Sequence, residues 1–276
     1  IREVERSRGL GDGYKRQRYN NEEAVGRALK EWTQEHNVPR SEIFITSKLW
    51  DADHSNAAQA IDDSLRKLQL DYIDMYLIHS PEPGEESFLQ AWKGLEAAVD
   101  AGKIRTIGVS NFDVEHLDAL LRNCRIKPAV NQIESHPFFA HEVLRSQTIE
   151  RGIQIEAYSP MAQGAALERE EIKAIASKHN KTPAQVLLRW GLQLGNIILP
   201  KSLTKHRIEA NAQLFDFELD NDDMDVLNGL DEGMKMGKLG PPGTSAPASP
   251  GATRPGSRRG SGSAGLAGNK LQMSSS

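Results

Sequence analysis

The chain has 276 residues, of which 38% are hydrophobic and 26% are charged, and its formal net charge is -4. This composition indicates a globular protein with room for one barrel of roughly 250 residues or for two smaller domains. The slight acidic excess argues against a nucleic-acid or anionic-membrane partner, and no apolar stretch approaches the roughly 20 residues of a membrane span. Cys124 is the single cysteine, which excludes an internal disulfide and favours a reducing, cytoplasmic location. A start at Ile1 rather than Met leaves open a preceding targeting sequence.

Residues 1–18 carry many charges and show no sustained helical or strand period. We interpret the glycine cluster at 9–13 as a turn, because a dinucleotide fingerprint needs a preceding strand and a third glycine. From Asn20 the pattern becomes helical, with asparagines suited to capping and an apolar stripe along one face. Residues 42–50 then read as a buried strand that carries Lys48 near its end.

Beyond residue 50 the sequence alternates between helical and strand periods. The helices are rich in Ala, Leu and charged residues, and the strands are short apolar runs. In the last long helical region Thr182 is a good N-cap, with Pro183 at the first helical position. The predicted helices are 56–68, 87–101, 114–123, 142–151, a longer region around 183, 203–211 and 222–230, and the predicted strands are 73–79, 104–111, 129–134, 153–158, a run that opens at 197, and 212–219.

This alternation amounts to seven βα steps and implies a parallel sheet, because right-handed crossover helices must cover it. The sequence NIILPKS at 196–202 ends an apolar run and opens a helical pattern, so free helix N–H groups, Ser202 and Lys201 can attract an anion there. The alternative is a capped helix with a solvated basic face. An open nucleotide-binding sheet places its phosphate site at the first βα turn, whereas this one comes late. We therefore predict an α/β fold, a (β/α)8 TIM-type barrel with one strand unaccounted for.

Polar side chains recur at the carboxyl ends of the predicted strands. In a barrel these ends meet at one rim, where such enzymes carry their active sites. Taken singly, each has an ordinary explanation: Lys48 as a solvated charge, His79 as a satisfied core histidine, Tyr158 as core filling. Their common position favours a functional interpretation. The residues concerned are Lys48, His79, Ser110, Asn111, Gln132, Glu134, Tyr158, Ser159 and Lys201.

Seven short runs carry most of these residues: YNNEEAVG from Tyr19, ITSKLW from Ile45, YLIHS from Tyr76, GVSNF from Gly108, NQ at Asn131, AYSP from Ala157 and LPKS from Leu199. In this order and spacing they resemble the aldo-keto reductase family, over about residues 19–236. The resemblance implies a (β/α)8 barrel that binds NADP(H) along its C-terminal rim, without a Rossmann domain. It also implies hydride transfer to a small aldehyde or ketone, no metal and a monomeric protein.

The resemblance assigns a chemical role to three residues. Tyr19 is expected to protonate the carbonyl oxygen, Lys48 to lower the pKa of that tyrosine, and His79 to orient the carbonyl. Hydride addition turns a carbonyl into a developing alkoxide, so a proton donor beside positive charge stabilises the transition state. Trp50 is expected to line the substrate pocket.

The resemblance also supplies a cofactor site. Tyr158 is expected to stack on the nicotinamide ring, and its carboxamide to be held by Ser110, Asn111 and Gln132. Ala210 departs from the family pattern, because the family often has Glu there as an adenine acceptor. The remaining expected contacts are Ser159 and Met161 on the pyrophosphate side, Lys201, Ser202 and Arg207 at the 2′-phosphate and adenosine, and Asn211 at the adenine.

A second departure lies upstream of Tyr19. In the family a barrel strand ends in an Asp a few residues before this tyrosine, and the Asp pairs with the lysine. Here Gly13 leads through Tyr14-Lys-Arg-Gln-Arg18 directly to Tyr19, with neither an apolar strand nor an Asp between. We therefore predict two unpaired sheet edges and impaired or absent turnover. The alternative to a reductase is a non-catalytic NADP-binding protein, either a regulatory subunit or a defective variant.

The last stretch, 237–276, is dominated by Gly, Pro, Ala and Ser and is predicted to be disordered. Its small arginine cluster at 254–259 is interpreted as part of a solvated tail, with contact to RNA or an acidic partner as the alternative. The predicted organisation is thus an irregular segment at 1–18 in place of a disrupted first βα unit, a reductase-like barrel at 19–236 and the tail at 237–276. No substrate can be named from the sequence.

Overall fold

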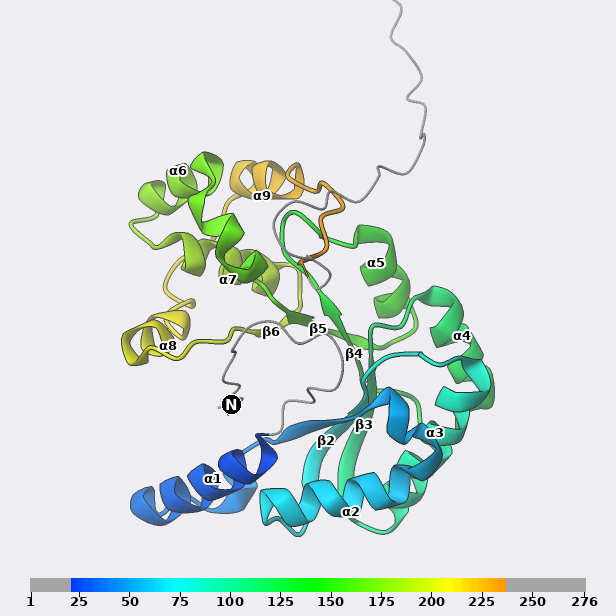
Figure 1. Ribbon diagram of the computed structural model, residues 1–276. Coiled ribbons are helices and arrows are strands. Elements are labelled where there is room, and N and C mark those ends of the chain that lie inside the picture. The colour runs from blue at the N-terminus through cyan, green and yellow to red at the C-terminus, as the bar shows by residue number, and fades with distance from the viewer. Residues whose placement is uncertain (1–20, 237–276) are drawn as a thin grey trace, which may run out of the picture. The chain divides into compact units, whose positions relative to one another are not determined.

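The computed structural model describes residues 21–236, and within them one parallel β-sheet organises the chain (Figure 1). The six strands of this part follow the sheet in chain order, so each new strand adds beside the one before it. All five pairings are parallel, for example Lys48 opposite Leu77 and Glu134 opposite Tyr158. The strands are β1 (Thr46–Leu49), β2 (Ile73–Ile78), β3 (Ile104–Ser110), β4 (Val130–Glu134), β5 (Gln154–Tyr158) and β6 (Ile197–Leu199).

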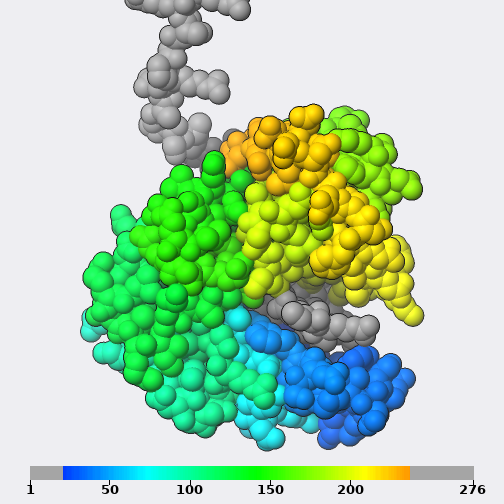
Figure 2. Space-filling view, turned by 180° about the vertical axis from the view of Figure 1, so that it is seen from behind, coloured from blue at the N-terminus to red at the C-terminus, as the bar shows by residue number. Residues whose placement is uncertain are grey.

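Helices connect the strands and cover the outer face of the sheet, as α2 to α5 do in Figure 1. Units adjacent in sequence are also adjacent in space, so the colours change gradually across the molecular surface (Figure 2). The α-helices are α1 (Glu22–His36), α2 (Ala57–Leu68), α3 (Glu85–Asp100), α4 (Val114–Asn123), α5 (Glu142–Glu150), α6 (Glu170–Lys178), α7 (Pro183–Gln193), α8 (Lys205–Asn211) and α9 (Asn221–Asn228). Three 3-10 helices are η1 (Arg40–Glu42), η2 (Asp51–Asn56) and η3 (Ala162–Glu168).

Side-chain caps fix where several helices begin. Thr182 Oγ1 accepts a hydrogen bond from the backbone N–H of Gln185, and the backbone N–H of Thr182 donates to Gln185 Oε1. With Pro183 at the first helical position, this confirms the predicted start of α7. Equivalent reciprocal caps start α4 at Asp113 and α9 at Asp220.

The core lies between the sheet and its helices. Every residue of β2 is buried, as expected for a central parallel strand covered on both faces. Three side chains of α3, Phe88, Trp92 and Leu95, are almost completely enclosed there. A second cluster joins η3, α6, α7 and the segment around α9. Burial of these large side chains is the main stabilising term of the fold.

The predicted strand at 212–219 is wrong: this segment runs as turns and irregular chain. Its backbone groups are bound by side chains of α7 rather than by a neighbouring strand. Gln193 donates to the Leu219 carbonyl at 2.9 Å and accepts from the Leu219 N–H at 2.8 Å. Gln185 donates to the Gln213 carbonyl, and Arg189 donates to the carbonyl of Leu214. Because side chains satisfy these backbone groups, the segment needs no neighbouring strand as a hydrogen-bond partner.

The described residues therefore form six strands, not seven, which is two fewer than a (β/α)8 barrel contains. The predicted strand at 42–50 is also shortened, because η1 takes its first residue and β1 begins only at Thr46. Within residues 21–236, β1 and β6 each pair with a single strand. The expectations for Tyr19, for 1–18 and for 237–276 lie outside the described residues.

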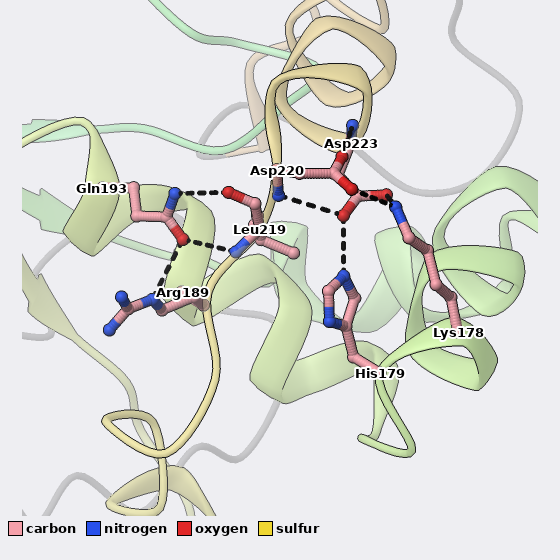
Figure 3. A network of polar contacts seen from close by, with 7 residues as sticks. All are labelled: Lys178, His179, Arg189, Gln193, Leu219, Asp220 and Asp223. Atoms are coloured by element: carbon pink, nitrogen blue, oxygen red, sulfur yellow. Dashed lines mark hydrogen bonds and ion pairs between the residues drawn. The ribbon is translucent and has the colours of Figure 1, made fainter.

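A network of polar contacts attaches α9 to α6 and α7 (Figure 3). The buried carboxylate of Asp223 accepts from His179 Nε2 at 2.6 Å and from Lys178 Nζ at 2.9 Å. Lys178 also contacts Asp220, the N-cap of α9. On α7, the side chain of Gln193 forms two hydrogen bonds with the backbone of Leu219, which lies just before α9.

Between residues 21 and 236, no helix is long and apolar enough to cross a membrane.

Candidate active site

The predicted rim exists as a set of contacts between the ends of neighbouring strands. His79 directly follows β2, Asn111 follows β3, and Tyr158 is the last residue of β5. Because the strands are parallel and sequential, their carboxyl ends lie along one edge of the sheet (Figure 1). Side chains from distant parts of the sequence are thereby brought within hydrogen-bond distance.

A chain of hydrogen bonds links these ends. The Tyr158 hydroxyl donates to Asn111 Oδ1 at 2.9 Å. Asn111 Nδ2 donates to the backbone carbonyl of His79 at 2.9 Å and to Ser110 Oγ at 3.1 Å. Ser110 Oγ in turn donates to the Gln132 carbonyl at 2.9 Å. Asn111 has a left-handed backbone, φ 60°, which asparagine tolerates better than most residues and which turns its amide to bridge these partners.

The imidazole of His79 is held from two sides. Its ring lies against the indole of Trp50, with 4.1 Å between the ring centroids and 38° between the planes. Its Nδ1 lies 3.4 Å from Asp51 Oδ1, at the long end of the hydrogen-bond range. The side chain is 29% exposed, so the ring is accessible to a ligand while its orientation is constrained.

Asp51 is a site residue that the sequence analysis did not identify. It begins η2, immediately after Trp50, and Ser80 Oγ also donates to its Oδ1 at 2.9 Å. Burial alone would raise the pKa of Asp51, but the hydrogen bonds from His79 and Ser80 outweigh it and leave this pKa below its ordinary value. The carboxylate is therefore ionised at neutral pH. Its only sequence signal was an acidic residue directly after a predicted strand end.

Lys48 and Gln132 line a cavity of about 430 Å³ that runs beside β1, α1 and α2. Lys48 is half-buried on β1, and Trp50 lines the same cavity. Gln132 is buried on β4, and its Nε2 donates to Glu156 Oε2 at 2.8 Å. The structure thus places these three predicted residues around one space.

Glu134, at the end of β4, faces a different partner. Its Oε1 accepts from the backbone N–H of Met236 at 2.6 Å and lies 3.2 Å from His136 Nε2. Both side chains are fully buried. Glu134 therefore anchors the end of the described chain. Met161 is likewise partly buried against the second core cluster rather than in contact with the chain of hydrogen bonds at the rim.

A cationic region follows β6. Lys201 and Arg207 are exposed, and neither forms an ion pair with any residue between 21 and 236. Ser202 Oγ accepts from the Thr204 N–H at 3.2 Å, so the loop folds back on itself before α8. Asn211 is the last residue of α8 and is half-buried. Ser159 belongs to the turn after β5, with φ 51°.

These features fit an extended dinucleotide phosphate. The Tyr158 ring is partly exposed while its hydroxyl is fixed by Asn111, which leaves an oriented aromatic face for stacking. Lys201 and Arg207, which form no ion pair with residues 21–236, suit a phosphate group. Ser110 and the Nε2 of Gln132 are engaged in internal hydrogen bonds, so they support Asn111 and the strand ends in this state. Within the described part of the chain, no cluster of His, Cys, Asp or Glu is arranged to hold a metal ion.

The chain is similar to known proteins over most of its length. A family model described as "Aldo/keto reductase family" matches residues 11–232. The glyoxal reductase of Bacillus subtilis (strain 168) is 48% identical over 221 residues, which cover 79% of this chain and 78% of that protein.

Two solved structures show the same similarity in three dimensions. A crystal structure of an aldo-keto reductase enzyme from a Medee basin deep-sea metagenome library matches with a TM-score of 0.75 and 40% identity, over 79% of this chain and 80% of that one. The Bombyx mori aldo-keto reductase in complex with NADP matches with a TM-score of 0.75 and 34% identity, over 79% and 77%. The predicted fold class, enzyme class and cofactor are thereby confirmed, and the chain belongs to the aldo/keto reductase family, whose members reduce carbonyl groups with NADPH.

Proposed function

We propose that this chain reduces small reactive aldehydes of the glyoxal type to alcohols. Its 48% identity to a glyoxal reductase supports the substrate class. The observation that carries the proposal is the chain of hydrogen bonds from Tyr158 through Asn111 to the backbone of His79. These hydrogen bonds connect Tyr158, which is proposed to stack on the nicotinamide, to His79, which is proposed to orient the carbonyl.

NADPH, when bound, supplies a hydride to the carbonyl carbon. Tyr158 presents its ring to the nicotinamide, and Ser159 and Met161 belong to the turn expected on the pyrophosphate side. Lys201 and Arg207 bind the 2′-phosphate through charge-assisted hydrogen bonds, with Ser202 and Asn211 beside them. Asn111 contacts the carboxamide, supported from below by Ser110 and Gln132.

The remaining roles concern the carbonyl oxygen. His79 orients this oxygen through the ring nitrogen that faces away from Asp51, and Trp50 forms one wall of the pocket. Tyr19 donates the proton that completes the alcohol, and Lys48 lies on the strand beside β2, where its charge favours that donation. A preorganised donor set of this kind stabilises the developing alkoxide more than the ground-state carbonyl.

We propose further that turnover is slower than in a complete barrel. Two observations support this: the described residues supply six strands, and residues 14–18 supply no carboxylate before Tyr19. The same observations support the second candidate, an NADP-binding protein without turnover. A monomeric state is also part of the proposal, and a cytoplasmic location is supported by the single Cys124.

Two measurements on the full chain separate these candidates. NADPH consumption with glyoxal and with 4-nitrobenzaldehyde measures turnover, and quenching of protein fluorescence by NADPH measures binding. A slow, saturable reaction supports an impaired reductase. Saturable binding without turnover supports the second candidate, a rate typical of the family refutes the impairment, and the absence of binding refutes both.

The cationic region has its own test. Replacing either Lys201 or Arg207 by Ala is expected to weaken NADPH binding about tenfold to a hundredfold, because one charge-assisted hydrogen bond contributes about 1.5–3 kcal/mol. Binding of NADH, which lacks the 2′-phosphate, should change little. Lys93→Ala, an exposed lysine on α3, is the matched control. Equal losses for both nucleotides would contradict a 2′-phosphate site.

A further inference from the structure

We propose that Asp51 is the positioning residue of His79: it binds the Nδ1 proton and so determines which ring nitrogen meets the carbonyl oxygen. This inference rests on the role proposed above for His79. Asp51 does not itself reach the substrate in the proposal; it acts through the imidazole.

The local geometry leaves the ring little freedom. Trp50 covers one face of the imidazole, and Asp51 Oδ1 lies 3.4 Å from Nδ1. The main chain of His79 is fixed as well, because its N–H donates to the Leu49 carbonyl at 2.9 Å and its carbonyl accepts from Asn111. Nε2 forms no hydrogen bond with the described residues, so it is the nitrogen available to a ligand.

The chemistry of the acceptor sets the tautomer. An ionised carboxylate can only accept, so the nitrogen facing Asp51 must carry a proton. In the neutral ring this leaves Nε2 as an acceptor, which cannot bind a carbonyl oxygen. In the protonated ring Nε2 carries a hydrogen and becomes a charged donor toward that oxygen. Asp51 thus couples recognition of the carbonyl to the imidazolium form of His79.

The surroundings of Asp51 support a fixed, ionised carboxylate. Ser80 donates to the same Oδ1 at 2.9 Å, and its own oxygen accepts the Glu82 N–H at 3.2 Å, which fixes the direction of the hydroxyl. Behind Asp51 lies the fully buried ring of His54, whose Nδ1 is 3.0 Å from Ser87 Oγ.

The second ring nitrogen of His54 also faces Asp51. His54 Nε2 is buried, has no hydrogen-bond partner among the described residues, and lies 4.0 Å from Asp51 Oδ1. Burial lowers the pKa of His54, which keeps this ring neutral at pH 7. The titratable groups around Asp51 are His79 and His54, with Asp53 beside the latter.

The tautomer can be read directly by long-range proton–nitrogen NMR of the full chain labelled with 15N-histidine. His79 signals are assigned by their loss in His79→Gln. For the neutral ring of the unaltered chain, we expect protonated Nδ1 and unprotonated Nε2. In Asp51→Asn the amide can donate to Nδ1, and the Nε2–H tautomer should become the major neutral form. Asp71→Asn, an exposed carboxylate in a turn, should leave the His79 spectrum unchanged.

Activity provides the second readout. With 4-nitrobenzaldehyde, kcat/KM of the unaltered chain should fall with rising pH as the imidazolium form is lost. In Asp51→Asn the fall from pH 5 to pH 9 should be at least tenfold smaller, because its neutral ring keeps an Nε2–H donor. The Kd for NADPH should stay within twofold, and Asp51→Glu should retain the pH profile of the unaltered chain. An Nε2–H tautomer in the unaltered chain, or an unchanged Nδ1–H tautomer in Asp51→Asn, overturns the inference. So do pH profiles of kcat/KM with the same shape in the two proteins. If the unaltered chain has no turnover, the NMR result still decides the role of Asp51, independently of the proposed function. Unchanged NADPH affinity and near-UV circular dichroism verify that each variant is folded.

Discussion

Removing the carboxylate of Asp223 should destabilise the fold in a way that the contacts of α9 allow us to quantify. Its side chain is only 5% exposed, and it accepts from His179 Nε2 at 2.6 Å and from the Asp220 N–H at 3.2 Å. A hydrogen bond to a charged group contributes about 1.5–3 kcal/mol and a neutral one about 0.5–1.5 kcal/mol. Lys178 is half-exposed, so water replaces that contact and we assign it no share.

The expected cost of Asp223→Ala is therefore at least about 3 kcal/mol, the lower bound for two hydrogen bonds to a charged group. For a domain of this size that corresponds to a fall in Tm of roughly 6–12 °C. Urea unfolding followed by circular dichroism gives the free energy of unfolding, and a thermal scan gives Tm. Asp225→Ala is the matched control, because Asp225 lies on the same helix, is exposed and forms no side-chain hydrogen bond with the described residues.

A difference of less than about 1 kcal/mol between the free energies of unfolding of the two variants, the size of an ordinary surface effect, would contradict this expectation. A double-mutant cycle with His179→Ala localises the effect. We expect a coupling of about 1–2 kcal/mol between Asp223 and His179, since they form one buried contact. Additive losses would mean that the contact contributes nothing and that the carboxylate acts through Asp220 alone.

Two further predictions concern the same region. Gln193→Ala should lower the free energy of unfolding by about 2 kcal/mol, because the N–H and the carbonyl of Leu219 both lose their hydrogen-bond partner. The control Gln59→Ala, at an exposed position on α2, should change this free energy little. Equal free energies of unfolding for the two variants in urea would contradict the prediction. Hydrogen bonds from Lys178 and from the Asp223 N–H lower the pKa of Asp220 to about 2, so its contribution is complete above its ordinary pKa of 3.8 and is lost as the pH falls toward 2. Urea midpoints measured from pH 5 to pH 2 should therefore fall less steeply in Asp220→Asn than in the unaltered chain, and parallel curves would refute this.

The rim could be predicted from the sequence because it depends on a simple rule. Parallel strands in chain order bring their carboxyl ends together, so polar residues that end apolar runs, such as His79 and Asn111, must lie near one another. The start of α7 could also be predicted, because Thr182 and Pro183 determine it through local contacts within the first turn of this helix. Asp51 was not, because its contact with His79 joins residues far apart in sequence and needs the geometry of η2.

The prediction of a strand at 212–219 was wrong for a related reason. Its alternation of large apolar residues matches a strand period, yet Phe215 is 80% exposed and Leu219 is buried by α7. The sequence pattern cannot reveal that glutamine and arginine side chains on α7 bind this backbone. Periodicity reports which side chains can share a face, whereas strand formation also requires a backbone partner.

The strand order from β1 to β6 has a consequence for how this architecture tolerates change. In a sheet where each strand pairs only with its predecessor and successor, the terminal units are also the edges. Adding or removing a βα unit at either terminus leaves all other pairings intact, whereas in a doubly wound sheet the first strand lies in the middle and its loss divides the sheet. The barrel topology is thus modular along the chain. Loss of a terminal unit affects the closure of the barrel and the part of the active site that this unit contributes.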